Sequence, residues 1–112
     1  NKETNHWVSD TFFSQLKKPI YLLNIARGEI VDTKSLLDAI EKGQIKGAGL
    51  DVLEFEPSSF SPFLESLPVH INKRLFDSKK IILTPHVAGW TKESYFKLSN
   101  VLASKIKSHF CL

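Results

Sequence analysis

Five residues with ionisable side chains are the main candidates for chemistry in this sequence of 112 residues. Arg27, Asp51 and His86 each follow a short apolar segment typical of a strand, and Glu54 and Glu56 come shortly after Asp51. A guanidinium binds anions in a planar fork, and an imidazole exchanges protons near neutral pH. If the three segments pair as parallel strands, these side chains meet at the carboxyl edge of the sheet, where open α/β sheets bind their ligands. We therefore expect a functional site at this edge.

Each candidate also has a plain structural interpretation. Arg27 could be a surface charge beside a tight turn, and Asp51 could cap a turn. Glu56 belongs to a common Glu-Pro loop dipeptide, and His86 could be a hydrogen-bonded structural histidine. Four further residues lie in polar, helical or terminal contexts, where we expect no role in chemistry and, for the histidines, solvated rings: His6, His70, His109 and Cys111. The prediction of a site therefore depends on the combination of candidates.

Motifs for other kinds of site are absent from the sequence. The glycines at positions 47 and 49 resemble the start of the dinucleotide-binding fingerprint GxGxxG, but position 52 is valine. The sequence holds no Walker lysine motif and no GxSxG nucleophile elbow. The histidines and the cysteine lack zinc-ligand spacing, so we expect no metal site.

The composition is that of an ordinary globular domain. Apolar residues make up 42% and charged residues 24%, which argues against disordered and low-complexity classes. No apolar run approaches the roughly 18 residues of a membrane-spanning helix, and the net charge of +3 is too small to indicate nucleic-acid binding. The lone cysteine favours a reducing compartment, and we expect the cytoplasm. Because the chain has no methionine and no secretory signal pattern, we expect a fragment of a longer protein.

Three short apolar runs predict the strands that position the candidates, at residues 20–25, 46–53 and 81–84. The first run does not alternate with polar residues, which is typical of a strand covered on both faces in a parallel sheet. Residues 58–80 are rich in serine and carry two prolines, and we expect a long packed connection without regular structure there.

Helices are predicted between and after these strands. Ser9, Asp32 and Thr91 are the expected N-caps, and Gly43 fits the position that follows the second helix. The last helix is the longest, with an apolar stripe at helical spacing: Leu98, Val101, Leu102 and Ile106. The alternation of helices with strands predicts an α/β unit with a parallel sheet and right-handed crossovers.

Four short motifs, taken in order, resemble one protein family. They are NIARG at residues 24–28, GLDV at 49–52, EP at 56–57 and TPHVAG at 84–89. In this order and at these spacings they resemble the D-isomer-specific 2-hydroxyacid dehydrogenases, which include D-3-phosphoglycerate and D-lactate dehydrogenases. The resemblance extends from residue 4 to residue 95.

This resemblance implies the second half of a Rossmann-type parallel-sheet NAD-binding domain in residues 1–90. Residues 91–112 would form a long helix that leads back toward a substrate domain. The glycine-rich phosphate loop and the ribose-binding acidic residue of the family do not occur in this sequence, so NADP stays open beside NAD. The resemblance also implies an exposed sheet edge and apolar face, and a chain that alone neither binds NAD tightly nor turns over.

Three catalytic residues are implied by the same resemblance. Arg27 would grip the substrate carboxylate and polarise the reacting carbonyl. His86 would be the general acid and base, and Glu56 would hydrogen-bond His86 and favour its protonated form. The implied cofactor contacts surround the nicotinamide end of NAD: Ile25, Ala26, Arg27, Asp51, His86, Val87, Ala88 and Gly89.

The implied partner is a small 2-hydroxy or 2-oxo acid, with 3-phosphoglycerate as one candidate, and the implied assembly is a homodimer. Neither nucleic acid nor a membrane is expected to bind. Trp90 and the long connection at residues 58–80 depart from the family pattern and leave the substrate unassigned. An alternative from another class is an NAD-sensing interaction protein, like the transcriptional corepressors of this family, which can retain the same residues.

Overall fold

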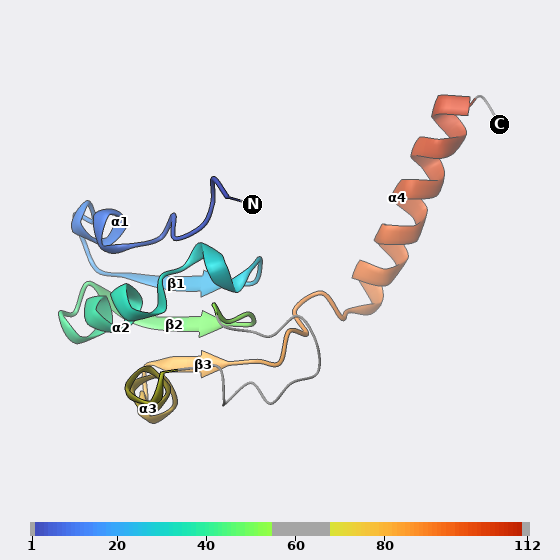
Figure 1. Cartoon of the computed structure of the whole chain (residues 1–112). Helices are drawn as coiled ribbons and strands as arrows, with labels where there is room; N and C mark the ends of the chain where they lie inside the picture. The colour runs from blue at the N-terminus through green and yellow to red at the C-terminus, as the bar shows by residue number, and fades with distance from the viewer. Residues whose placement is uncertain (1, 55–67, 111–112) are drawn as a thin grey trace.

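A parallel three-stranded sheet forms the centre of the fold (Figure 1). The structure is a computed structural model that describes residues 2–54 and 68–110. The strands lie side by side in the order β1 (Ile20–Asn24), β2 (Ile45–Leu50) and β3 (Ile81–Leu83), and both neighbouring pairs are parallel. All three predicted strands are present. Their ends lie within one residue of the prediction, except that β2 ends at Leu50 instead of residue 53. Residues 51–54 leave the sheet as a turn, which carries Asp51 and Glu54 beyond the strand end.

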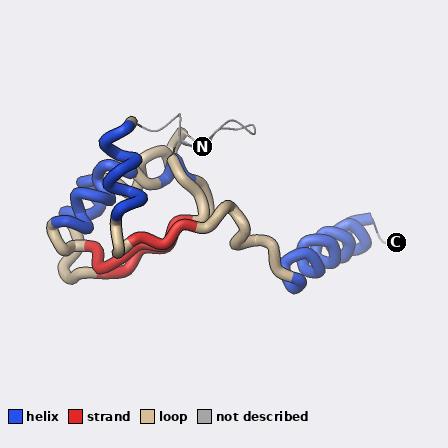
Figure 2. The backbone as a smooth tube through the Cα atoms, turned by 90° about the horizontal axis from the view of Figure 1, so that it is seen from below, coloured by secondary structure: helices blue, strands red, loops and turns tan. Residues whose placement is uncertain are grey.

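The helices near the sheet cover one of its faces, as Figure 2 shows. They are α1 (Asp10–Ser14), α2 (Thr33–Glu41) and α3 (Val69–Asp77), and the 3-10 turn η1 (Gly28–Ile30) leads into α2. Phe13, Leu36, Ile45 and Leu75 are the largest side chains buried almost completely between the helices and the sheet. Burial of these apolar side chains stabilises the helical layer on this face.

The sequence signals for helix ends are mostly confirmed. The Asp32 side chain accepts a hydrogen bond from the backbone N–H of Ser35 at 2.6 Å, and the Thr91 hydroxyl accepts one from Ser94 at 3.0 Å. Gly43 has a φ of +77°, a conformation that glycine adopts without strain. Ser9 has the extended backbone of an N-cap, but its side chain makes no capping hydrogen bond.

Helix α3 was not expected, because residues 58–80 were predicted to lack regular structure. Residues 69–77 of this connection are helical, and Ile71 and Leu75 are buried one turn apart against the core. Apolar residues at positions i and i+4 are typical of a helix, but a single such pair in a short segment is a weak pattern. The rest of the predicted connection up to residue 67 lies outside the described residues.

The other face of the sheet is open and apolar. Tyr21, Leu23 and Ile82 are each more than 70% exposed there, and they line a hollow of about 300 Å³ together with Gly47 and Gly49. This arrangement confirms the expectation of an exposed apolar face. A face of this kind is normally covered by further protein.

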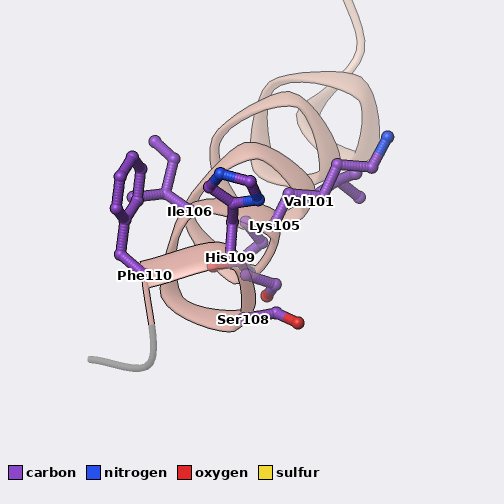
Figure 3. A pocket seen from close by; sticks show the side chains of 8 residues that line it. Val101, Lys105, Ile106, Ser108, His109 and Phe110 are labelled. Carbon is purple, nitrogen blue, oxygen red and sulfur yellow. The ribbon is translucent and has the colours of Figure 1, made fainter.

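The last helix, α4 (Lys92–Phe110), extends away from the sheet and its covering helices (Figures 1 and 2). None of its residues is buried, so the apolar stripe predicted at residues 98–106 packs against nothing in the described part of the chain. The hollow shown in Figure 3 measures about 980 Å³, but residues of α4 alone line it. It is therefore an open groove along one helix. Among the described residues, no helix combines the length and the apolar character that crossing a membrane requires.

Candidate functional site

Backbone hydrogen bonds join the carboxyl ends of the three strands at one edge of the sheet. The N–H of Asp51 donates to the carbonyl of Asn24 at 2.9 Å, and the N–H of Thr84 donates to Leu50 at 3.0 Å. Beyond the strands, the N–H of His86 donates to the carbonyl of Asp51, also at 3.0 Å. The loops of Arg27, Asp51 and His86 therefore lie at the same edge, as the sequence predicts.

Asp51 is buried, and its carboxylate holds the loop that follows β3. Its Oδ1 accepts hydrogen bonds from the Thr84 hydroxyl at 2.6 Å and from the N–H of Val87 at 2.9 Å, and its Oδ2 accepts one from the N–H of Ala88 at 2.9 Å. The Thr84 hydroxyl, these two amides and the nearby His86 hold the pKa of Asp51 below its ordinary value, against the effect of burial. Asp51 is therefore ionised at neutral pH.

His86 is presented by this loop in an unusual backbone conformation. Its φ is +55°, in the left-handed region that residues other than glycine rarely adopt. Its N–H lies 3.0 Å from the carbonyls of both Asp51 and Thr84, and the next two amides bond the Asp51 carboxylate. The surrounding hydrogen bonds therefore fix the conformation from which the imidazole projects. The residue is exposed.

Arg27 follows β1, and Asn24 fixes the backbone around it. The Asn24 side chain donates to the carbonyl of Arg27 at 2.9 Å and accepts from the N–H of Ala26 at 3.2 Å. Nη1 of Arg27 donates to the carbonyl of Ala26 at 2.7 Å, and the arginine is exposed. Asn24 is 6% exposed and was not among the predicted site residues. Its place at a strand end, three residues before the arginine, was the signal available for it.

The remaining predicted cofactor residues lie in the same two loops. Ile25 is 67% exposed, and Ala26, Ala88 and Gly89 are also exposed, whereas Val87 is half-buried. Their backbones are placed by Asn24 on one side and by Asp51 on the other. Glu56, the predicted partner of His86, lies outside the described residues.

A second group of polar side chains lies beside these loops: His6, Asp32 and Glu54. Nε2 of His6 lies 2.5 Å from Oε1 of Glu54, and Nδ1 of His6 lies 3.7 Å from Oδ2 of Asp32. Burial acts to raise the pKa of Asp32, but hydrogen bonds from Ser35 and the positive charges of His6 and Lys34 outweigh it and lower that pKa. The His6 side chain is 42% exposed, as expected for a solvated ring, but its contacts with two carboxylates distant in sequence were not predicted.

These three side chains are of types that bind metals, and one ligand atom from each falls within 4.8 Å of the others. Their oxygens already hold the first turn of α2, however. Glu54 accepts from the N–H of Thr33 at 2.8 Å, and Asp32 accepts from Ser35 at 2.6 Å. These hydrogen bonds explain the group as a structural contact between the N-terminal segment, the turn after β2 and the start of α2, which we call the junction of His6 with Glu54.

The first 88 residues match the family model described as D-isomer specific 2-hydroxyacid dehydrogenase, NAD binding domain. The chain is 40% identical over 90 residues to a glyoxylate reductase of Thermococcus kodakarensis, covering 80% of this chain and 23% of that relative. The chain spans between about a quarter and a third of the length of the relatives it matches.

Two solved structures share both the fold and part of the sequence. A D-lactate dehydrogenase from Treponema pallidum superposes with a TM-score of 0.69 at 32% identity, covering 93% of this chain and 34% of its own. A D-lactate dehydrogenase from Aquifex aeolicus, complexed with NAD and lactic acid, gives a TM-score of 0.69 at 31% identity, covering 98% of this chain and 34% of its own. The parallel sheet and its helices are thus those of a Rossmann-like NAD-binding domain.

Proposed function

Because this chain belongs to the D-isomer-specific 2-hydroxyacid dehydrogenase family and matches its NAD-binding domain, we propose that it supplies cofactor-binding and catalytic residues to an oxidoreductase. The reaction is hydride transfer between NAD and a D-2-hydroxy acid or its 2-oxo acid. The observation that carries the proposal is the ladder of hydrogen bonds that places the loops of Arg27, Asp51 and His86 at one edge. Residues 1–90 are the second half of the dinucleotide-binding domain, and residues 91–112 lead toward a substrate domain.

The carboxyl edge of the sheet fits the nicotinamide end of the cofactor. Exposed Ile25 offers an apolar surface to a planar ring, and a side chain added at Gly89 would meet no atom within 4 Å, so the loop is open to a ligand. We assign the cofactor contacts to Ile25, Ala26, Arg27, Asp51, His86, Val87, Ala88 and Gly89. When bound, the cofactor supplies the hydride. NADP is the alternative to NAD, since the ribose-binding residue of the family is not in this sequence. Comparing turnover of NADH with that of NADPH by the full-length protein decides between them.

Arg27 binds the substrate in this proposal. A guanidinium presents two parallel N–H donors that match the two oxygens of a carboxylate, and it remains charged at every working pH. The hydrogen bonds of Asn24 hold the backbone from which this side chain extends. The same positive charge polarises the neighbouring carbonyl of a 2-oxo acid.

His86 is the general acid and base. It gives a proton to the oxygen of the reduced carbonyl, or takes that proton in the reverse direction, because an imidazole titrates near neutral pH. Glu56 accepts a hydrogen bond from the imidazole in this proposal and favours its protonated form. The left-handed backbone of His86 gives the ring a defined starting position for both steps.

The proposed substrates are small 2-oxo acids. The glyoxylate reductase and D-lactate dehydrogenases among the relatives favour glyoxylate and pyruvate, and 3-phosphoglycerate is included as a candidate for the reverse reaction. We further propose that the enzyme is a homodimer in the cytoplasm.

The test places this chain in the Treponema pallidum D-lactate dehydrogenase, in exchange for the segment it matches. We expect this chimera to oxidise NADH with a 2-oxo acid. His86→Ala lowers kcat by a factor of about 100 or more, as expected for a lost general acid. Arg27→Lys raises KM for the 2-oxo acid, because an ammonium cannot replace the planar fork.

The outcomes separate the proposal from its alternative. A folded chimera that binds NADH but does not turn over would contradict the enzyme assignment and favour an NAD-sensing role. Turnover that survives His86→Ala at a near-normal kcat would contradict the role of His86. An unchanged KM in Arg27→Lys would contradict the role of Arg27.

A further inference from the structure

Glu54 joins three segments of the chain beside the candidate site. Its side chain is only 9% exposed, and both of its oxygens are hydrogen-bonded. Oε1 bonds Nε2 of His6 at 2.5 Å, and Oε2 accepts from the N–H of Thr33 at 2.8 Å. The turn after β2, the N-terminal segment and the start of α2 therefore meet at one buried carboxylate.

The N-terminal segment, which Glu54 holds through His6, also forms backbone hydrogen bonds with the loop that follows Arg27. The N–H of His6 donates to the carbonyl of Glu29 at 2.8 Å, and that of Val8 donates to Ile30 at 3.0 Å. Val8 forms a parallel β-bridge with Val31. His6 itself has a φ of +50°, and contacts of both its backbone and its side chain hold this conformation.

On its other side, the same loop lies against the turn that carries Glu54. A Cβ added to Gly28 would fall 1.9 Å from the carbonyl oxygen of Leu53 and 2.5 Å from the backbone nitrogen of Glu54. The turn directly after Arg27 is thus enclosed between the His6 segment and residues 53–54. Glu54 belongs to one of these two segments and is hydrogen-bonded to His6 of the other, so its position fixes both of them.

We propose that Glu54 is a positioning residue for Arg27, and that it acts through its hydrogen bond with His6 and through the contact of residues 53–54 with Gly28. This inference rests on the proposed function, since it assigns Arg27 to the substrate. The guanidinium donates a hydrogen bond to the adjacent carbonyl of Ala26, so the direction of this side chain follows its loop. Loss of the Glu54 carboxylate lets the loop move and misplaces the guanidinium.

The first test uses the 112-residue chain and measures amide hydrogen exchange by NMR. Glu54→Ala is expected to speed exchange at the Ile30 and Val31 amides, which bond the carbonyls of Arg27 and Gly28, by about tenfold or more relative to the β2 amides. Glu41→Ala is the matched control, because its carboxylate pairs with Arg74 at the opposite end of α2. Equal exchange in the Glu54→Ala and Glu41→Ala variants would overturn the proposal.

Two further substitutions show whether faster exchange reports a misplaced loop or a chain that no longer folds. Glu54→Gln retains an acceptor for the Thr33 N–H, and its new amide N–H can donate to the unprotonated ring nitrogen of His6. It is therefore expected to restore most of the protection. His6→Ala leaves Glu54 in place and should reproduce the faster exchange at Ile30 and Val31, even if the Glu54→Ala chain does not fold. Normal exchange at these amides in His6→Ala would overturn the coupling.

The second test measures kinetics in the Treponema pallidum chimera. Glu54→Ala is expected to raise KM for the 2-oxo acid about tenfold with a smaller change in kcat, as misplaced substrate binding requires. A purely structural lesion lowers the active fraction and reduces kcat with KM unchanged, and that result would overturn the positioning role. A chimera that is inactive with Glu54 in place contradicts the proposed function instead, whatever the exchange rates show.

Discussion

At the scale of single residues, Asp51 uses a buried charge to shape a loop. A carboxylate has about four acceptor sites, and three hydrogen bonds from Thr84, Val87 and Ala88 occupy part of them. Burial of a charge is costly unless such bonds compensate it. The carboxylate therefore explains why the loop adopts a conformation that places His86 in the left-handed region.

The lowered pKa of Asp51 predicts a specific dependence of stability on pH. A carboxyl whose pKa in the folded chain lies below its unfolded value stabilises the fold fully above that unfolded value of about 3.8, and the contribution is lost as pH falls through the folded pKa. Asp51→Asn removes this contribution. We expect the variant to be less stable than the wild type at pH 7 and the difference to shrink toward pH 3.

Urea unfolding of both chains between pH 3 and pH 7 measures this effect. Asp38→Asn serves as a comparison, because hydrogen bonds from Lys34 and Arg74 also lower the pKa of Asp38, whose side chain is half-buried. The pH dependence of stability lost in Asp38→Asn should be smaller than that lost in Asp51→Asn, because solvent screens these partly exposed ion pairs. Parallel stability curves for the wild type and Asp51→Asn would contradict the account of Asp51.

At the scale of elements, the contact between η1 and the turn after β2 requires glycine at position 28. A Cβ there would lie 1.9 Å from a backbone oxygen, which cannot move aside as a flexible side chain can. We expect Gly28→Ala to destabilise the fold by about 1–3 kcal/mol, the usual cost of overpacking. Gly89→Ala is the control, because its Cβ meets nothing within 4 Å. Equal unfolding midpoints in urea for the two variants would contradict this contact.

Two substitutions in α3 test whether apolar packing or ion pairs contribute more to the stability of its attachment to α2. Leu75 is 1% exposed, whereas Arg74 reaches Asp38 and Glu41 from a partly exposed position. Leu75→Ala should cost about 2–5 kcal/mol through a lost side chain and a cavity, and Arg74→Ala about 0–1 kcal/mol. Thermal and urea unfolding of both variants measure the difference. A larger loss of unfolding free energy in Arg74→Ala than in Leu75→Ala would show that the ion pairs hold α3 in place.

The elements also show which features can be read from sequence. Asp32, Gly43 and Thr91 act through contacts within one turn of their own helix, so their local signals were sufficient. Helix α3 was missed because two apolar residues gain their meaning only against the core. The junction of His6 with Glu54 spans 48 positions, and no local pattern marks it. The loops of Arg27, Asp51 and His86 were placed correctly because parallel strands deliver their ends to one edge.

At the scale of the whole molecule, two apolar surfaces are uncovered within residues 2–54 and 68–110. The open sheet face exposes Tyr21, Leu23 and Ile82, and α4 exposes apolar side chains along its length. Surfaces of this kind associate with other protein surfaces in water. The site is also incomplete within this sequence, since no glycine-rich fingerprint is present to hold the cofactor phosphates.

The 112-residue chain alone is therefore expected to associate with itself and to lack dehydrogenase activity. Burying the open face in a second copy removes apolar surface from water, at a gain of roughly 25 cal/mol per Å². Sedimentation analysis should show a mass above 12.7 kDa that rises with concentration. Leu23→Lys places a charge on a side chain that is 79% exposed, so it should lower association and leave the unfolding midpoint of the monomer nearly unchanged. A chain that stays monomeric at all concentrations would contradict the expected self-association. Oxidation of NADH with a 2-oxo acid by this chain alone would contradict the expected lack of activity.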